Sequence, residues 1–340
     1  MSVRHIFWIE ELRKEQKKLV GNKCANLGEM AGMGLPVPGG FALTVEAYKN
    51  FLNETGTAGE IKKYLKEQGN GVNDTTRQAA ISEHVREMVQ SVAIPEGMEK
   101  EISGYYKELC SKSNSKEVAV SVRSSGPVSH PGQYETLLNI TGESELIEGI
   151  KKVWASTFNS RSLAFRNREG LPLESDPIGI VVLKMVDAKA AGIIFTANPN
   201  TGDTSRIIIE ANWGLGESVV SGRSTPDIFT LDKNTLEIVE KKLGPKSSYM
   251  ATDKKGITEV KSSSEKSASF CISDDEAKKI AEFGKVIEDH FGAPQDIEWA
   301  TIHSTDIAES IFLLQTRNEV IAQEKSSSDQ IIDLMIKRFS

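Results

Sequence analysis

The sequence predicts a mixed α+β protein with two lobes. Segments with helical periodicity dominate residues 17–113, and apolar runs typical of strands dominate from residue 117 onward. The chain has 340 residues, 39% hydrophobic and 26% charged, which is enough to bury two cores. Helices followed by a strand-rich half indicate an α+β arrangement.

The first half is expected to form helices separated by short strands. Strands are expected at 3–9 and 35–44, and Thr44 then provides an N-cap for the following helix. The expected helices cover residues 22–34, 45–54, 57–68, 75–92 and 95–113.

The second half is expected to be mostly strands. The expected strands cover residues 117–125, 132–142, 178–186, 191–199, 206–214, 227–232, 236–242, 296–302 and 310–317. The expected helices cover residues 143–158, 160–170 and 274–291, the last with Ser273 as N-cap and Gly292 just past its end. The short turn at 187–190 predicts a hairpin between its two flanking strands. The last two strands are expected to pair with each other.

These elements suggest domain boundaries. We expect a first lobe at 1–200, a second lobe at 201–322, and a linker with a tail helix at 323–340. Residues 262–269 and 324–328 are expected to be loop and linker. The tail has one apolar stripe of Ile331, Ile332, Met335, Ile336 and Phe339. That stripe could pack on its own domain or dock on a partner chain.

Bulk properties exclude several classes of protein. A net charge of −7 argues against a nucleic-acid partner, whose binder would be basic. Cys24, Cys110 and Cys271 are too few and too dispersed for a disulfide framework or a zinc site. No apolar run approaches the length of a membrane span, and the charged N-terminus does not resemble a signal peptide. A cytoplasmic location is expected, with no membrane partner.

Two strands near the end carry polar residues in alternation. Asp296 and Glu298 share one face of their strand, and Gln315 and Arg317 share one face of theirs. Pairing of these strands would line one cleft with oxygen ligands suited to Mg²⁺ and a guanidinium suited to phosphate. The alternative is an ordinary surface strand with alternating charge.

Other segments offer phosphate contacts. Arg123 stands where a strand meets a Ser-Ser-Gly turn, and Lys23 lies near a helix start, where backbone N–H groups favour anions. Gly132 would allow close backbone approach, and Thr136 offers a hydroxyl. A turn-capping Arg and a solvated Lys are the plain alternatives. The glycines within 210–227 indicate a constrained loop.

Taken in order, these segments resemble a known family between about residues 18 and 318. The motifs are VGNKCANLGEMAGMGLPVPGGFALTVEAYKNFL, VSVRSSG, GQYETLLNITG, VWASTFNSRSLAFRN, IIFTANPNTGD, EANWGLGESVVSGRSTPD, DIEWA and FLLQTR. They are similar to the N-terminal nucleotide-binding domain of phosphoenolpyruvate synthase and pyruvate phosphate dikinase. Rifamycin phosphotransferase and the ATP-binding subunit of phenylphosphate synthase share that domain.

The resemblance implies an ATP-grasp fold that holds ATP and Mg²⁺ between two lobes. It implies a dikinase-type reaction, in which ATP yields AMP, orthophosphate and a phosphohistidine on a swivelling domain. By resemblance, Lys23 and Arg123 contact phosphate, and Gly132 and Thr136 belong to the loop over the phosphates. By the same resemblance, Glu298, Gln315 and the neighbouring Asp296 bind magnesium and ATP, and Arg317 is the catalytic arginine. Lys184 and Met185 contact the adenine.

The sequence departs from the family pattern in two places. Leu183 stands where family members commonly have Gln, and the loop at 124–131 is shorter than in phosphoenolpyruvate synthase. None of the five histidines, including His130, has the family's Thr-Ser-His-Ala context. We therefore expect the acceptor histidine and a small phenol-like or pyruvate-like acceptor on a separate subunit, as in phenylphosphate synthase. The alternatives are a nucleotide-binding regulatory subunit and an ATP-grasp ligase.

Overall fold

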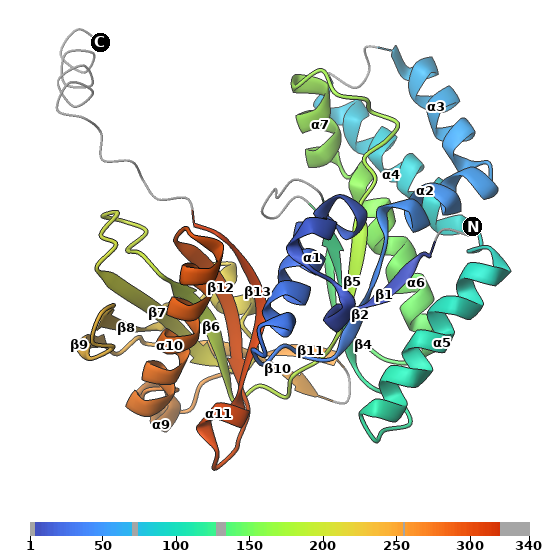
Figure 1. The fold of residues 1–340 in the computed structure, drawn as a ribbon. Coiled ribbons are helices and arrows are strands. Elements are labelled where there is room, and N and C mark those ends of the chain that lie inside the picture. The colour runs from blue at the N-terminus through green and yellow to red at the C-terminus, as the bar shows by residue number, and fades with distance from the viewer. Residues whose placement is uncertain (1–3, 70–73, 127–133, 254–255, 320–340) are drawn as a thin grey trace, which may run out of the picture. The chain divides into compact units, whose positions relative to one another are not determined.

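The computed structural model describes residues 4–69, 74–126, 134–253 and 256–319, and it confirms a mixed α+β protein (Figure 1). The chain divides into two compact units, Met1–Asp187 with Thr252–Ile257 and Ala188–Ala251 with Thr258–Ser340. The division falls after Asp187 rather than after residue 200. The reason is that the strand at Ala190–Phe195 pairs within the second unit.

The first unit contains a five-stranded antiparallel sheet in the order β1-β2-β5-β3-β4. Its strands are β1 (Ile6–Trp8), β2 (Gly40–Leu43), β3 (Val120–Ser125), β4 (Thr136–Ile140) and β5 (Gly179–Lys184). Its α-helices are α1 (Lys17–Gly32), α2 (Val45–Glu54), α3 (Thr57–Gln68), α4 (Thr75–Ser91), α5 (Glu96–Lys112), α6 (Glu143–Ala155) and α7 (Ser160–Arg168). Every helix and strand predicted for this part of the chain is present. Thr44 caps α2 as predicted, because its hydroxyl accepts a hydrogen bond from the Ala47 N–H at 3.1 Å.

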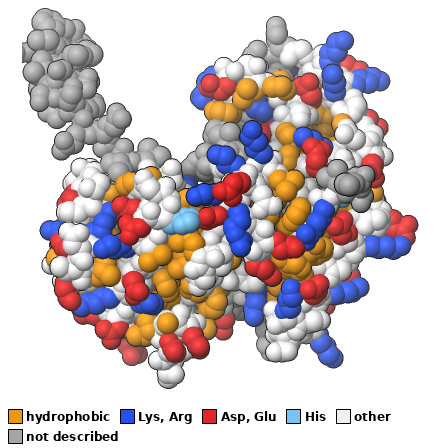
Figure 2. All heavy atoms as spheres, viewed as in Figure 1, with side chains coloured by type: hydrophobic (Ala, Val, Ile, Leu, Met, Phe, Trp, Pro, Cys, Tyr) orange, Lys and Arg blue, Asp and Glu red, His pale blue; other side chains and the backbone are white. Residues whose placement is uncertain are grey.

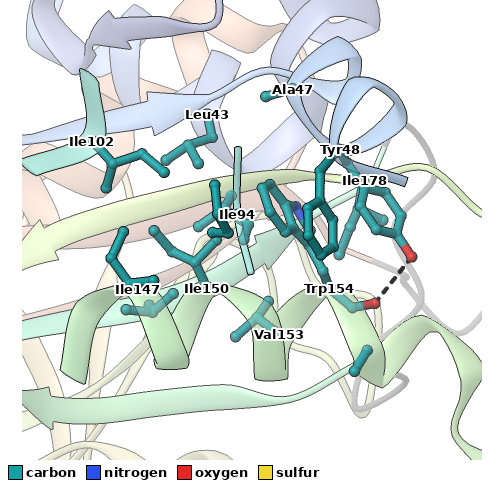
Figure 3. Packing of buried hydrophobic residues seen from close by; sticks show 14 of the residues in the cluster. Leu43, Ala47, Tyr48, Ile94, Ile102, Ile147, Ile150, Val153, Trp154 and Ile178 are labelled. Carbon is teal, nitrogen blue, oxygen red and sulfur yellow. Dashed lines mark hydrogen bonds between the residues drawn. The ribbon is translucent and has the colours of Figure 1, made fainter. Parts of the chain in front are cut away.

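Trp154 of α6 lies at the centre of the core of the first unit (Figure 3). Its side chain is fully buried and stacks on Tyr48 and Phe51 of α2, with ring centroids 5.4 and 5.0 Å apart. Stacked aromatic pairs of this kind add to the free energy gained from burying apolar area. Val122 of β3 packs on the same helix, near Gly149. Side chains on the other face of β3 therefore point away from α6.

The second unit contains a six-stranded sheet in the order β13-β12-β6-β7-β8-β9. Its strands are β6 (Ala190–Phe195), β7 (Arg206–Trp213), β8 (Asp227–Asp232), β9 (Ile238–Lys242), β12 (Gln295–Thr301) and β13 (Ile311–Asn318), and β10 (Ser248–Asp253) pairs separately with β11 (Gly256–Lys261). Its helices are α8 (Glu217–Val220), α9 (Ser264–Ser267), α10 (Asp274–Phe291) and α11 (Ile307–Ser310).

The boundaries of α10 confirm the prediction from its capping residues. Ser273 and Glu276 form a capping box, and Gly292 adopts a left-handed conformation with φ of 72° directly after the helix. The helix packs on the sheet through Gly284, where an added Cβ would lie 3.3 Å from a methyl group of Ile194 in β6. The face of the sheet that carries Ile194 is therefore the one covered by α10.

The predicted hairpin through residues 187–190 is wrong. Strand β5 pairs with β2 and β3, whereas β6 pairs with β7 and β12, so consecutive strands belong to different sheets. Both strands are apolar on both faces, and such a pattern does not indicate which neighbour a strand takes. A short helix, α9, lies in the predicted loop at 262–269, and the β10–β11 pair was not predicted. The linker at 324–328 and the tail helix lie outside the described residues.

Charge is distributed evenly on the face shown in Figure 2, where acidic and basic side chains of the described residues intermingle. None of the described helices combines the length and the hydropathy needed to cross a bilayer. The predicted cytoplasmic location stays a prediction.

Gly21 is a position where a larger residue is expected to be costly. Its φ is +80°, and an added Cβ would lie 1.9 Å from the backbone oxygen of Ser125. We expect Gly21→Ala to lower the free energy of unfolding by about 2–3 kcal/mol, from the backbone conformation and the steric clash together. Gly34 is the matched control, since its φ is +77° and nothing lies within 4 Å of an added Cβ.

Chemical denaturation of both variants tests this expectation. Gly34→Ala should show only the conformational cost, about 1 kcal/mol. Equal destabilisation by the two substitutions would show that the close approach between Gly21 and Ser125 is not a tight contact.

Candidate functional site

Four polar side chains share one face of the β12–β13 pair. The register places Asp296 opposite Arg317 and Glu298 opposite Gln315, as the alternation of the two strands predicts. Residues directly opposite each other in an antiparallel pair point to the same face. Ile297 is the register partner of Ile194 and so points toward α10. The four polar side chains therefore lie on the face of the sheet that α10 does not cover.

Arg317 and Asp296 form the central ion pair of this face. The Nε and Nη2 atoms of Arg317 both donate to Oδ2 of Asp296, at 2.8 and 2.5 Å. Burial raises the pKa of Asp296, and the charge of Glu298 raises it further, while the guanidinium of Arg317 opposes both effects. The pair thus fixes the orientation of the guanidinium.

Glu210 of β7 is a site-facing residue that the sequence analysis missed. Ile193 of β6 is the register partner of both Glu298 and Glu210, so all three side chains point to the same face. Burial raises the pKa of Glu210, and the nearby charge of Asp296 raises it further. A single glutamate within the apolar strand RIIIEANW was the signal that could have identified it.

The carboxylates on this face would need help to bind a metal ion. Among the described residues, no group of three His, Cys, Asp or Glu side chains could hold a metal. Mg²⁺ commonly takes one or two protein carboxylates and completes its coordination with water and substrate phosphates. Glu298, Gln315 and Asp296 fit that mode, because they present oxygen atoms from one sheet face beside a cationic side chain.

In the first unit, Lys23, Arg123 and Thr136 are brought together. Helix α1 is interrupted at Gly21 and continues from there, so Lys23 lies in the first turn of the continuing helix. The backbone N–H groups on either side of Lys23 donate to Gly126 (2.9 Å) and to the Ser125 hydroxyl (3.1 Å), which joins this turn to the end of β3. Arg123 lies in β3 directly opposite Thr136 of β4.

The tight contact at Gly21 explains this arrangement. Only a residue without a side chain allows α1 to approach the carbonyl of Ser125 so closely. The result is a helix start, with its partial positive charge, beside a lysine and an arginine. Such a combination favours anions, and phosphate in particular.

The residues expected at the adenine lie at the end of β5. Leu183 is buried with 2% of its surface exposed, whereas Lys184 is exposed. The backbone N–H groups of Lys184 and Met185 donate to Gly39 and Ala119, which fixes the chain as it leaves the strand. Gly132 and the shortened loop from residue 127 onward lie outside the described residues, as does His130.

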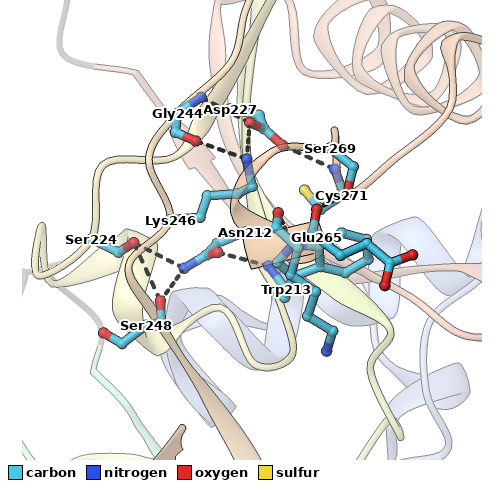
Figure 4. A network of polar contacts seen from close by, with 11 residues as sticks. Asn212, Trp213, Ser224, Asp227, Gly244, Lys246, Ser248, Glu265, Ser269 and Cys271 are labelled. Atoms are coloured by element: carbon cyan, nitrogen blue, oxygen red, sulfur yellow. Dashed lines mark hydrogen bonds and ion pairs between the residues drawn. The ribbon is translucent and has the colours of Figure 1, made fainter. Parts of the chain in front are cut away.

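The glycine-containing segment at 210–227 is tied down by a buried polar network, which confirms that it is constrained (Figure 4). The Asn212 amide donates to the hydroxyls of Ser218 and Ser224 and to the Ser248 carbonyl, at 3.2, 3.0 and 3.0 Å. Asp227 accepts from the Lys246 ammonium and from the N–H groups of Gly244 and Cys271.

The chain matches known proteins over nearly its whole length. Residues 17–337 match the family described as pyruvate phosphate dikinase, AMP/ATP-binding domain. A probable phosphoenolpyruvate synthase of Staphylothermus marinus is 37% identical over 94% of this chain and 41% of its own length. A probable phosphoenolpyruvate synthase of Methanocaldococcus jannaschii is 38% identical over 88% of this chain and 26% of its own length. One of Archaeoglobus fulgidus is 38% identical over 96% of this chain and 43% of its own length.

This chain thus spans less than half the length of each of these relatives. The matched residues include Lys23 and Arg123 of the first unit and Glu298 and Arg317 of the second unit. The chain belongs to the family of pyruvate phosphate dikinase AMP/ATP-binding domains.

Proposed function

We propose that this chain is the ATP-binding part of a dikinase-type phosphotransferase with an ATP-grasp fold. The observation that carries the proposal is the register of β12 and β13, which gathers two carboxylates, an amide and a guanidinium on one sheet face. Phosphoryl transfer needs positioning and charge neutralisation more than covalent chemistry, and these groups supply both. Membership in an ATP-binding family supports the choice of nucleotide.

The proposed roles differ between the two units. Lys23 and Arg123 would bind phosphate oxygens, with Thr136 and Gly132 beside them. Glu298, Gln315 and Asp296 would hold Mg²⁺, which would neutralise charge on the phosphates. Arg317, already oriented by Asp296, would stabilise the charge that develops during transfer. The backbone at Lys184 and Met185 would contact the adenine.

In the proposed reaction ATP gives AMP, and of its two transferred phosphoryl groups one goes to a histidine and the other to water, which yields orthophosphate. We place that histidine on a swivelling domain of a separate subunit, which would pass the phosphate to a small phenol-like or pyruvate-like acceptor. The relatives named phosphoenolpyruvate synthase extend well beyond the matched part, so further domains accompany this one in those proteins. The resemblance to the ATP-binding subunit of phenylphosphate synthase remains part of this proposal.

Lys23→Met tests nucleotide binding directly. The substitution keeps the length of the stem and removes one charge, so the Kd for ATP·Mg²⁺ should rise at least tenfold, the size expected for one charge-assisted hydrogen bond. Isothermal titration calorimetry measures it. Lys18→Met is the matched control, because Lys18 is an exposed lysine of the same helix. Equal affinity of the two variants would refute the role of Lys23.

The products distinguish the reaction types. The chain, its candidate partner subunit and [β-³²P]ATP should yield AMP, orthophosphate and an acid-labile label on a partner histidine. ADP formation with a carboxylate and an amine, without the partner, would indicate a ligase instead. ATP binding without transfer to a partner known to be active would indicate a regulatory subunit.

A further inference from the structure

A partly buried polar cluster in the first unit surrounds the residues that directly precede Thr136. The Tyr134 hydroxyl donates to Oδ2 of Asp176, and Nη1 of Arg166 lies 3.4 Å from the same oxygen. Nη2 of Arg166 donates to the Thr157 carbonyl at 2.7 Å. We call Arg166, Asp176 and Tyr134 the clasp. It connects the residue that enters β4 to α7 and to the segment before β5.

Arg166 is an unusual residue to find at this depth. Only 2% of its surface is exposed, and its guanidinium lies 5.3 Å from the centre of the Phe158 ring. Its Nε has no hydrogen-bond partner among the described residues. Burying a charge in this way costs free energy that an apolar side chain of similar volume would not cost. A buried charge is therefore weak evidence for a gain in stability, and the clear effect of these contacts is to fix the geometry of the chain around Arg166.

Glu135, the next residue, is held as well. Its backbone N–H donates to the buried Ser156 hydroxyl at 3.1 Å, and Arg86 of α4 donates to its carboxylate at 2.6 Å. Two consecutive residues are thus tied to the helical layer. The residue after them is Thr136, which lies opposite Arg123.

We propose that Tyr134, Asp176 and Arg166 are positioning residues for the phosphate-binding residues of the first unit. The clasp fixes where the chain enters β4 and so holds Thr136 beside Arg123. This inference rests on the proposed function, since it assigns to the clasp the placement of the groups that contact the triphosphate. The residues of the clasp themselves do not touch the nucleotide.

Tyr134→Phe is the decisive substitution, because it removes one hydroxyl and keeps the ring. The Kd for ATP·Mg²⁺ should rise about five- to tenfold, because Thr136 is no longer held beside Arg123, a coupling of ordinary size between a positioning residue and a binding site. The affinity for adenosine, which has no phosphate, should be unchanged, which shows that the variant is folded and that the loss is confined to phosphate binding. Asp176→Asn, which retains an acceptor oxygen but no charge, should give a smaller rise of the same kind.

Tyr105→Phe is the matched control. The Tyr105 hydroxyl also donates a hydrogen bond in this unit, to the Ile6 carbonyl at 3.1 Å. Ile6 belongs to β1, at the edge of the sheet opposite to β4. Its loss should leave both affinities unchanged. Equal ATP affinity of Tyr134→Phe and wild type would overturn the inference, and so would parallel losses of ATP and adenosine affinity. A wild-type chain that binds no ATP would instead overturn the proposed function.

Discussion

Replacing Arg317 by methionine is expected to slow phosphoryl transfer from ATP about a thousand-fold, the lower end of the effect measured for arginines that stabilise a transferring phosphoryl group. Methionine retains an unbranched apolar stem but carries no charge. The substitution removes the cation that Asp296 orients on the polar face of β12 and β13. The measurement is the rate of AMP formation in the presence of the partner subunit and Mg²⁺.

The second unit contains a close structural match for this pair. Arg206 and Asp232 also lie opposite each other on neighbouring antiparallel strands, with Nη1 and Oδ2 2.5 Å apart. Both arginine side chains have 34% of their surface exposed. Arg206→Met removes the same kind of ion pair at a position that is not directly beside Glu298 and Gln315. The rate of phosphoryl transfer should therefore stay near that of the wild type. Similar losses in the two variants would mean that Arg317 acts only through stability.

Replacing Asp227 by alanine is expected to lower the free energy of unfolding by about 3–5 kcal/mol, the usual effect of removing one partner of a buried ion pair. Asp227 and Lys246 both have no exposed side-chain surface, and Nζ and Oδ1 are 2.5 Å apart. The substitution leaves a buried ammonium ion whose remaining acceptor is the Gly244 carbonyl. It also removes the acceptor of two buried backbone N–H groups.

Lys246→Met should be less damaging than Asp227→Ala. The aspartate then loses its ion partner but still accepts two backbone hydrogen bonds, from Gly244 and Cys271. Glu96→Ala, which breaks the exposed pair with Lys100, should change stability very little. Urea denaturation followed by circular dichroism ranks the three variants. If Asp227→Ala behaved like Glu96→Ala, water or another group would have to compensate the buried charge.

Local sequence signals predicted much of the fold. Caps identified the start of α2 and both ends of α10, because a hydroxyl at an N-cap and a glycine after the last turn satisfy the free backbone groups of a helix. Alternation on β12 and β13 predicted which side chains share a face, because a strand has a period of two residues. These signals depend only on residues that are close together in the sequence, so they can be read without the tertiary structure.

Pairing between distant segments was less predictable. The apolar pattern of β5 and β6 suggested a hairpin, but each strand is the partner of strands far away in the sequence. Glu210 lies on the same face of the sheet as Glu298 and in line with it, and this position likewise depends on β6 lying between β7 and β12. A local sequence pattern does not indicate which strands will lie on either side of a given strand in the sheet.

The sequence alone determined the α+β class and the capped ends of α2 and α10, and it predicted the residue types that we propose for binding magnesium and phosphate. The tertiary structure decided which residues meet within each unit: Lys23 beside the end of β3, Arg317 on Asp296, and the buried Asp227 with Lys246. The physical reason is that hydrogen-bonding periodicity acts over a few residues. Close packing and the pairing of charges away from water act between segments that only the folded chain brings together.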